Sequence, residues 1–207
     1  MIKLEKGQKI NLQKANDSHL SNFCIGLNWG MIEEVSSGFF GMGGSKKKIA
    51  VDLDASCVVL DSNKNILDIV SFRKLKSSDN AILHSGDDRA GDDAGDDGFD
   101  NEIISIDLDR ISSQANQVVF FLNSFRKQDF ATIPYAHIRL FEGTPRQVKE
   151  VFANYNISAE NKFSGYISMV MGKLYKHNNE WKFTAIGEPT RDASLEETVN
   201  TIVRNYS

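Results

Sequence analysis

The chain has 207 residues, of which 41% are apolar and 10% aromatic, with 13 phenylalanines among them. This content is enough to bury a sizeable core, which excludes disorder as the default state. No linker divides the chain, and we expect a single domain over residues 1–207. The start lacks the apolar run of a secretion signal, and no stretch is long and apolar enough to cross a bilayer. We therefore expect a cytoplasmic protein that does not span a membrane.

Charge is concentrated in one segment. Between His84 and Glu102, eight acidic residues accompany a single basic residue, Arg89, which gives this segment a net charge of −7. The remainder of the chain then carries +3, since the total is −4. An acidic segment on a nearly neutral body favours a cation as the ligand and argues against nucleic acid as a partner.

Alternation of apolar and polar residues predicts strands along most of the chain. Residues 23–29 and 51–59 each have one apolar face. Further strands are predicted at residues 66–72, 102–108, 117–125, 135–142, 148–157, 165–176 and 181–187. Clusters of Gly, Asn, Asp and Ser separate these segments, a pattern typical of a β-sandwich of mostly antiparallel strands.

One helix is predicted, at the end of the chain. Ser194 and Glu197 have the spacing of a capping box. Apolar residues then recur at helical intervals on one face, namely Leu195, Val199, Ile202, Val203 and Tyr206. The expected fold is therefore all-β, a β-sandwich with a C-terminal helix packed against it.

Two long loops interrupt this scaffold, at about residues 33–48 and 84–102. Long loops on a rigid sandwich commonly carry function. The first places Phe39, Phe40 and Met42 beside the lysines of Lys46–Lys48. This mixture favours either a partly disordered loop or one that contacts an anionic membrane surface or a partner.

The second loop, GDDRAGDDAGDDGFDNE, contains pairs of carboxylates that are each preceded by a glycine. Calcium takes about six to eight oxygen ligands in flexible geometry, from carboxylates, amides and backbone carbonyls. Glycine permits the positive φ angles that fold such a loop around an ion. Neither an EF-hand pattern nor a nonapeptide calcium repeat is present. The loop favours calcium binding, and a solvated acidic loop without a ligand is the alternative.

A second pair of carboxylates lies in a predicted strand. Asp52 and Asp54 alternate with Val51 and Leu53, so both project from one face, roughly 6.5–7 Å apart along the strand. Two such carboxylates repel each other unless a cation or a donor lies between them. The strand therefore offers further carboxylate ligands for the metal. The alternative is that Asp52 and Asp54 are solvated charges on an edge strand. Magnesium is less favoured because it prefers fewer protein ligands.

Positive signals for catalysis are missing from the sequence. Cys24 and Cys57 form no CxxC pair and lie in strand-like segments, so we expect two reduced, buried thiols; a disulfide or a redox-active thiol is the alternative. No nucleophile-elbow pattern is present. The histidines have no metal-ligand spacing, and only His84 adjoins the acidic loop, where we expect a surface or supporting role. We do not expect an enzyme.

Six motifs, in order, resemble the TerD family of tellurium-resistance proteins, and within it the TerZ and TerX branch. They are GLNWG at residues 26–30, VDLDASCVVLD at 51–61, SFRKLKS at 71–77, the GDDR…DNEIISIDL run at 86–108, AHIRL at 136–140 and GKLYKHNNEWKFTAIGE at 172–188. The resemblance extends from about Ile2 to Glu188.

The resemblance implies a calcium-binding β-sandwich of the bacterial stress response, with resistance to tellurite, phages and colicins, that acts as a calcium-dependent binding or adaptor module. It implies more than one calcium ion, and it implies the integral membrane protein TerC and other TerD-family proteins as partners, hence a place at the inner face of the membrane. The metal ligands carried over are Asp52, Asp54, Asp87, Asp88, Asp92, Asp96, Asp97, Asp100, Asn101 and Glu102.

This chain departs from the family pattern at two places. Many members carry Asp where this chain has Gly30, so a ligand from that side chain is missing, and the acidic run is longer near Gly98–Asn101. Two other functions stay open. One is an enzyme or thiol-based protein that detoxifies tellurite through Cys24 or Cys57, and the other is a calcium-dependent peripheral membrane binder.

Overall fold

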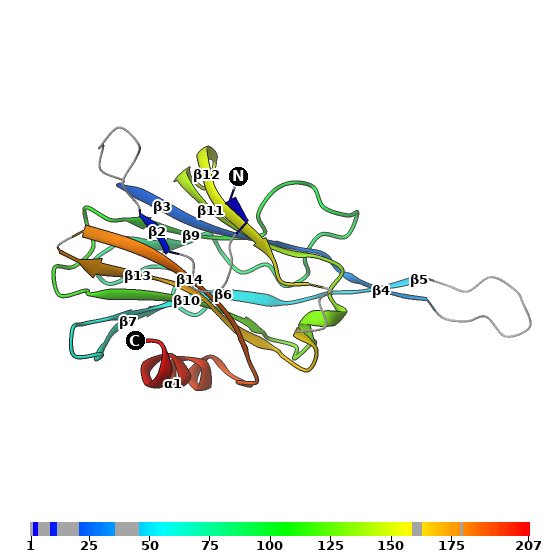
Figure 1. The fold of residues 1–207 in the computed structure, drawn as a ribbon. Helices are drawn as coiled ribbons and strands as arrows, with labels where there is room; N and C mark the ends of the chain where they lie inside the picture. The colour runs from blue at the N-terminus through cyan, green and yellow to red at the C-terminus, as the bar shows by residue number, and fades with distance from the viewer. Residues whose placement is uncertain (1, 4–8, 12–20, 36–45, 159–162, 179) are drawn as a thin grey trace, which may run out of the picture.

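Two six-stranded sheets form a sandwich in the computed structural model of the chain, which describes residues 2–3, 9–11, 21–35, 46–158, 163–178 and 180–207 (Figure 1). In spatial order, the first sheet contains β1 (Ile2–Lys3), β12 (Gln147–Asn156), β11 (Ala136–Thr144), β3 (Asn22–Trp29), β9 (Glu102–Asp107) and β8 (Ile82–His84). The second contains β2 (Lys9–Asn11), β14 (Glu180–Thr190), β13 (Ser168–His177), β10 (Gln117–Ser124), β6 (Leu53–Leu60) and β7 (Ile66–Val70). Neighbouring strands are antiparallel, apart from the parallel pair of β1 and β12.

Alternate side chains of the strands form the core between the two sheets. Phe23, Ile25 and Leu27 of β3 meet Phe120 and Leu122 of β10 in one buried cluster. The period of two in the sequence therefore corresponds to real inward and outward faces. The predicted β-sandwich of mostly antiparallel strands is confirmed.

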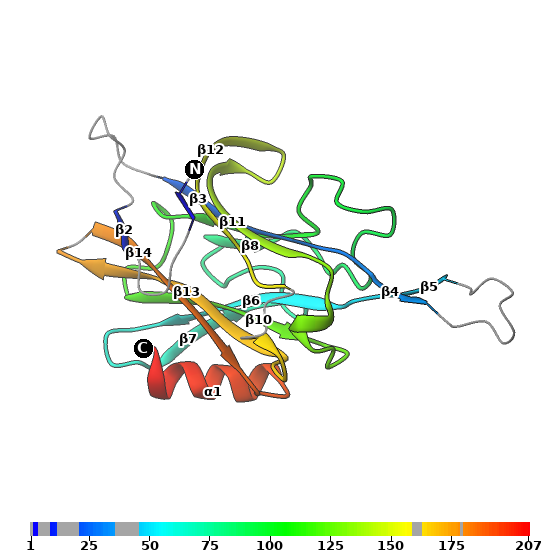
Figure 2. The ribbon, with the colours of Figure 1, turned by 45° about the vertical axis from the view of Figure 1, so that its right-hand side comes forward.

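A second apolar layer covers the outer face of β6, β10 and β13. It is made by α1 (Leu195–Asn205), which lies across that face in Figures 1 and 2, and it buries Val58, Phe121, Val199 and Ile202. Because both faces of β6 are covered, all eight of its residues are buried. The helix begins as predicted, since the N-cap Ser194 accepts a hydrogen bond from the backbone N–H of Glu197.

The first expected loop is partly strand. β4 (Ile32–Val35) and β5 (Lys46–Ile49) pair as an antiparallel ribbon that projects from one end of the sandwich. The sequence did not indicate this, because the lysines of β5 lack an apolar alternation. Phe39, Phe40 and Met42 lie outside the described residues. A 3₁₀ turn at Phe130–Thr132 was also not predicted.

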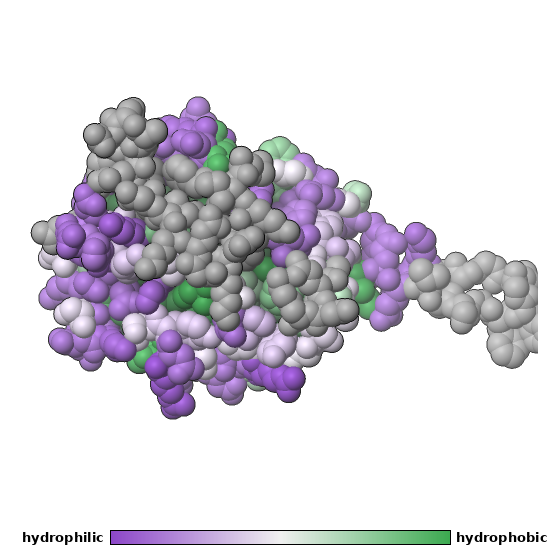
Figure 3. Space-filling view, in the orientation of Figure 1, coloured by the Kyte–Doolittle hydropathy of each residue, from purple (hydrophilic) through white to green (hydrophobic). Residues whose placement is uncertain are grey.

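Hydrophilic residues predominate among the coloured residues on the face seen in Figure 3, and the hydrophobic ones lie in small separate patches. Within the described ranges, no helix has the length and apolar character needed to cross a membrane.

Candidate metal centre

The acidic loop, residues 85–101, connects β8 to β9 and folds over the ends of β3 and β6. Backbone hydrogen bonds hold it there: Asp92 donates to Trp29 and accepts from Met31, and Val51 donates to Ala90, each with an N···O distance of 3.0 Å. Gly91 has a φ of +75°, and a Cβ there would lie 2.6 Å from the Trp29 ring. Glycine is therefore required where the loop passes the indole.

This folding brings Asp87 of the loop to the two aspartates next to and within β6. One carboxylate oxygen each from Asp52, Asp54 and Asp87 lies within 4.8 Å of the other two. Asp52 and Asp54 are buried, whereas Asp87 is exposed. These three residues, named here the first carboxylate group, line a cavity of about 270 Å³. Phe72, Arg89, Phe125 and Arg126 complete its walls.

Asp54 has the most unusual environment of the group. Its side chain belongs to a residue only 4% exposed, and within the described part of the chain no hydrogen bond reaches its carboxylate. Burial, followed by the charges of Glu102, Asp52 and Asp87, raises the pKa of Asp54 to about 8, against a smaller opposing effect of His84. A buried carboxylate with no donor and three acidic neighbours is stabilised when a cation lies beside it.

Two arginines partly neutralise the other members of the first carboxylate group. Arg126 Nε lies 3.6 Å from Asp52 Oδ2, and Arg89 Nε donates to Asp87 Oδ2 at 2.9 Å. The pKa of Asp52 is nevertheless raised, because burial and the charge of Asp87 outweigh the effect of Arg126. Both arginine side chains are largely exposed, so their ion pairs with these aspartates are screened by solvent.

A second carboxylate group consists of Asp92, Asp96 and Asp97, which also bring one oxygen each within 4.8 Å of the other two. It is more open to solvent than the first. Tyr135 donates its hydroxyl hydrogen to Asp92 Oδ2 at 2.8 Å, and Asn28 Nδ2 donates to Asp96 Oδ1 at 2.9 Å. Burial, followed by the hydrogen bond to Asp92, raises the pKa of Tyr135, so the phenol remains a donor.

Glu102 lies behind the first carboxylate group and is bonded to protein groups. Its Oε2 accepts the backbone N–H of Ala55 at 2.8 Å, and its Oε1 accepts that of Asp88 at 3.2 Å. His84 Nε2 lies 3.4 Å from the same carboxylate. Burial raises the pKa of Glu102 despite His84, and the pKa of His84 is raised by Glu102 although burial acts against it. His84 therefore supports the site, as a neighbour of the loop in sequence and in space.

The remaining three predicted ligands are also bonded to protein groups. Asn101 accepts the backbone N–H of Trp29 through Oδ1 at 2.8 Å and donates to Asp88 and Asp92. Asp88 Oδ1 accepts two backbone N–H groups of the loop itself. Asp100 forms an ion pair with Arg139 at 2.7 Å, and burial raises its pKa despite that arginine. These side chains hold the shape of the loop.

The ten residues predicted from the sequence thus fall into three sets. Six of them form the two carboxylate groups, with three residues in each, and the other four are bonded to protein groups that fix the shape of the loop. Four neighbours were missed, namely Asn28, Arg126, Tyr135 and Arg139. Only their position at the end of the sandwich that the acidic loop covers connects them to the site. That position depends on strand pairing, which the sequence does not display.

Comparison with protein-family models matches residues 1–202 to the TerD domain. The chain belongs to the TerD family. Among its TerD-family relatives are stress response protein SCP2 of Bacillus subtilis (strain 168), 36% identical with 98% of this chain and 99% of that protein covered, and tellurium resistance protein TerZ of Serratia marcescens, 33% identical with 98% and 97% covered. Tellurium resistance protein TerX of the same organism is 30% identical, with 99% of each chain covered.

Solved TerD-like structures share the fold. The crystal structure of a homologue of telluride resistance protein (TerD) from Streptomyces coelicolor A3(2) aligns with a TM-score of 0.63 at 16% identity, over 86% of this chain and 98% of that one. At this level of identity the likeness supports the sandwich alone.

Both thiols of this TerD-family chain are buried and unpaired, as predicted. Burial, followed by the charge of Asp100, raises the pKa of Cys24 to about 12. Burial likewise raises the pKa of Cys57. Because the thiolate is the nucleophilic form, neither cysteine is prepared for thiol chemistry in this conformation.

Proposed function

We propose that this chain is a calcium-dependent binding or adaptor module within the tellurium-resistance and stress-response family to which it belongs. The observation that carries the proposal is Asp54, a buried carboxylate to which no group in the described part of the chain donates, gathered with Asp52 and Asp87 around one cavity. An ion with a preference for oxygen ligands would stabilise this arrangement. In this proposal the chain has no catalytic activity of its own.

Each carboxylate group would hold one ion, so more than one calcium is proposed. Three carboxylates can supply up to about six oxygens when they bind through both oxygens, which suits calcium better than magnesium with its retained waters. The other four predicted ligands would support the ions indirectly, because their contacts with protein groups already fix the loop backbone. They are Asp88, Asp100, Asn101 and Glu102. The ion would remove the repulsion within each group and so rigidify the loop.

The surface that such an ion would stabilise has exposed aromatic side chains beside it. Phe99 of the acidic loop is 73% exposed, and Phe125, which lines the cavity of the first carboxylate group, is 59% exposed. Exposed aromatic residues next to an ordered loop are typical of protein contacts. We propose a partner at this end of the sandwich, with TerC and other TerD-family proteins as the candidates and the inner face of the membrane as the place.

The proposal is tested by calcium titration calorimetry together with thermal melts of the metal-free and calcium-loaded chain. Wild type is expected to bind more than one calcium and to melt at a higher temperature with it. Asp54→Asn should remove one binding event, and the double variant Asp96→Asn, Asp97→Asn should remove another. Asp93→Asn is the matched control, because Asp93 lies in the same loop but in neither group. If wild type neither binds calcium nor gains stability from it, the proposal is wrong.

Calcium-dependent contact with a membrane is a second candidate, favoured by the exposed lysines Lys46, Lys47 and Lys48 on β5. These cations project with the ribbon at the loop end of the sandwich, and Lys48 donates to the backbone carbonyl of Asp93. Cosedimentation of the calcium-loaded chain with anionic vesicles tests this function. Equal sedimentation with and without vesicles excludes it.

A further inference from the structure

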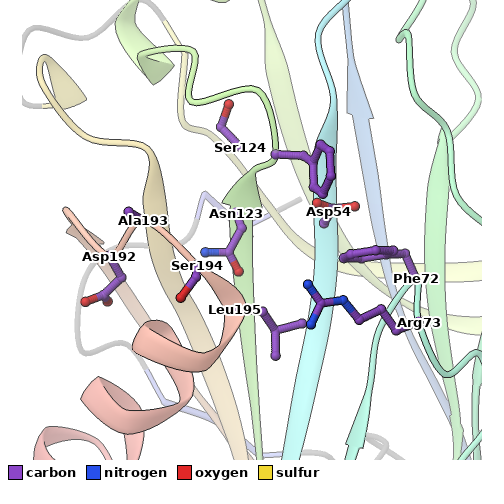
Figure 4. Close-up of a pocket in the computed structure, with 10 residues that line it drawn as sticks. Asp54, Phe72, Arg73, Asn123, Ser124, Asp192, Ala193, Ser194 and Leu195 are labelled. Atoms are coloured by element: carbon purple, nitrogen blue, oxygen red, sulfur yellow. The ribbon is translucent and has the colours of Figure 1, made fainter.

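A separate cavity of about 130 Å³ lies where α1 begins, at the ends of β6 and β10. Figure 4 shows Asn123 of β10 and Asp54 of β6 among the residues that line it, with Phe72 and Arg73 on one side, Asp192, Ala193 and Ser194 on the other, and Leu195 of α1 between them. Asp54, Phe72 and Phe125 also line the larger cavity of the first carboxylate group, so they form the wall between the two spaces.

The orientation of the Asn123 amide is determined by its neighbours. Its Nδ2 donates to Ser168 Oγ at 2.8 Å and to Thr198 Oγ1 at 2.9 Å. Each of these hydroxyls gives its own hydrogen to a backbone carbonyl, Ser168 to Asp192 and Thr198 to Ser194. They can therefore only accept from Asn123, and the amide must turn its NH₂ toward them.

The Oδ1 of Asn123 is consequently directed away from the hydroxyls, into the cavity, as Figure 4 shows. Asn123 is 7% exposed, and within the described residues this oxygen has no hydrogen-bond partner. Leaving a buried acceptor unpaired is unfavourable. This oxygen is a closed-off, unpaired acceptor at the edge of the cavity, and a donor that enters the cavity would satisfy it after a shift of the neighbouring side chains.

Asp54 places a second acceptor beside the first. It is directly opposite Asn123 in the pairing of β6 with β10, and both side chains lie on the face that α1 covers. The other acid of the cavity, Asp192, accepts from the hydroxyls of Thr190 and Thr201. The one cation, Arg73, is bonded to Glu196 at 2.6 Å. When Asp54 is ionised, as a bound cation favours, the charged lining residues Asp54, Asp192 and Arg73 give the cavity a formal charge of −1.

We propose that this cavity binds the ammonium group of a small amine. An ammonium supplies N–H donors for Asn123 Oδ1 and Asp54 and a positive charge for a negative cavity. Phe72 and Phe125 have ring centroids 5.8 Å apart in an edge-on arrangement, and the Arg73 guanidinium already lies over the Phe72 ring, 5.2 Å from its centroid. Phe125 is therefore the aromatic ring that would attract a bound cation. The volume equals that of roughly four waters of about 30 Å³, so the head group of a small molecule fits.

The same ammonium chemistry occurs in simple alkylamines and in α-amino acids. An amino acid would add a carboxylate, and the exposed guanidinium of Arg73 is the group that would meet it. Comparing the affinity of the cavity for an alkylamine and for an α-amino acid therefore identifies which of the two supplies the ammonium group.

The direct test is a nuclear magnetic resonance titration of the full, metal-free chain with ethylammonium, tetramethylammonium, glycine and acetate at constant ionic strength. Ethylammonium should give saturable shifts of the Asn123 side-chain NH₂ and of the Ser194 amide. Tetramethylammonium has the charge but no N–H donor, and should bind at least about tenfold more weakly. Glycine binding more tightly than ethylammonium identifies an amino acid as the ligand, and the reverse order identifies an alkylamine.

Variants locate the site. Ala193→Phe fills the mouth of the cavity from an exposed position, and Asn123→Ala removes the acceptor; each should weaken ethylammonium binding at least about tenfold. Phe99→Ala, an exposed aromatic residue remote from this cavity, is the matched control and should bind like wild type. If Asn123→Ala fails to fold, Ala193→Phe alone shows whether ethylammonium binds in this cavity. Absence of saturable shifts, equal binding of tetramethylammonium, or binding of acetate alone would overturn the proposal and leave a cavity for water.

Asp54 also couples this cavity to the first carboxylate group, and this coupling, unlike the amine site itself, rests on the proposed calcium binding. Two cations on one carboxylate repel, so saturating calcium should weaken ethylammonium binding, and ethylammonium should weaken calcium binding by the same factor. Calcium binding without any effect on ethylammonium would overturn the coupling. A lack of calcium binding would instead contradict the proposed function, while the metal-free titration still decides the amine site.

Discussion

Glu102 and Ala55 connect the two sheets directly behind the first carboxylate group. Glu102 begins β9 in one sheet, and its Oε2 accepts the backbone N–H of Ala55 in β6 of the other sheet at 2.8 Å. The same carboxylate accepts from Asp88 of the acidic loop. One buried side chain therefore sets the distance between the β6 aspartates and the loop that supplies Asp87.

Replacing Glu102 by alanine is expected to destabilise the fold. The backbone N–H groups of Ala55 and Asp88 would lose their acceptor, and buried donors without partners cost about 1–3 kcal/mol each. We expect a loss of about 2–4 kcal/mol in the free energy of unfolding, measured by urea denaturation of the metal-free chain. Glu34→Ala, at an exposed position on β4, is the control and should stay within about 0.5 kcal/mol of wild type. A similar small effect for Glu102→Ala would show that the connection between the sheets is unimportant.

Stability of the metal-free chain should fall as the pH rises. Asp54 has a folded pKa of about 8 against an ordinary value of 3.8, so between these values the folded state keeps a proton that the unfolded state has lost. This contribution is fully present below the ordinary pKa and is lost as the pH rises through about 8. The raised pKa values of Asp52 and Glu102 act in the same direction.

Thermal melts in a chelating buffer between about pH 5 and pH 8.5 measure this slope, since the window follows from the pKa values that burial shifts. Asp54→Asn cannot titrate and should show a clearly smaller decline. A stability that rises with pH in wild type, with the chelator present, would contradict the described environment of Asp54.

Gly91→Ala should be far more disruptive than Gly95→Ala. At Gly91 the new Cβ would lie 2.6 Å from the Trp29 ring and 2.9 Å from its carbonyl oxygen, with a φ of +75°. At Gly95 the φ is +101° but no atom lies within 4 Å, so only the backbone strain remains. We expect a loss of about 3 kcal/mol for Gly91→Ala and about 1 kcal/mol for Gly95→Ala by denaturant unfolding. Equal losses would mean that the loop does not pack against Trp29.

The two cysteines should be inert in the folded chain. Both thiols are buried and their pKa values are raised, so a thiol-reactive dye should label them only after unfolding. Alanine replacement of both should keep tellurite resistance in a host that depends on this protein, provided that the variant folds. Rapid labelling of the native chain, or loss of resistance with folding intact, would favour the thiol-based rival function.

The extent to which the fold followed from the sequence can be seen in β3 and β6. Their apolar residues alternate with a period of two because one face of each strand must be dry, and this local rule is visible without any partner. The capping box at Ser194 is equally local, and helix α1 starts where it predicts. The ribbon of β4 and β5 lacks such a pattern, because backbone pairing between polar strands leaves no periodic trace of burial.

For the candidate site, the sequence by itself determined the kind of chemistry, since a run of paired aspartates and glycines is a local property of the acidic loop. Only the tertiary structure decided which carboxylates meet. Asp54 and Asp87 are brought together by the pairing of β6 within its sheet and the path of the loop over Trp29, whereas Asp100 is turned to Arg139 and Glu102 to Ala55. Proximity between distant segments depends on sheet packing, which involves the whole chain at once, and therefore leaves no signal in the spacing of the acidic residues.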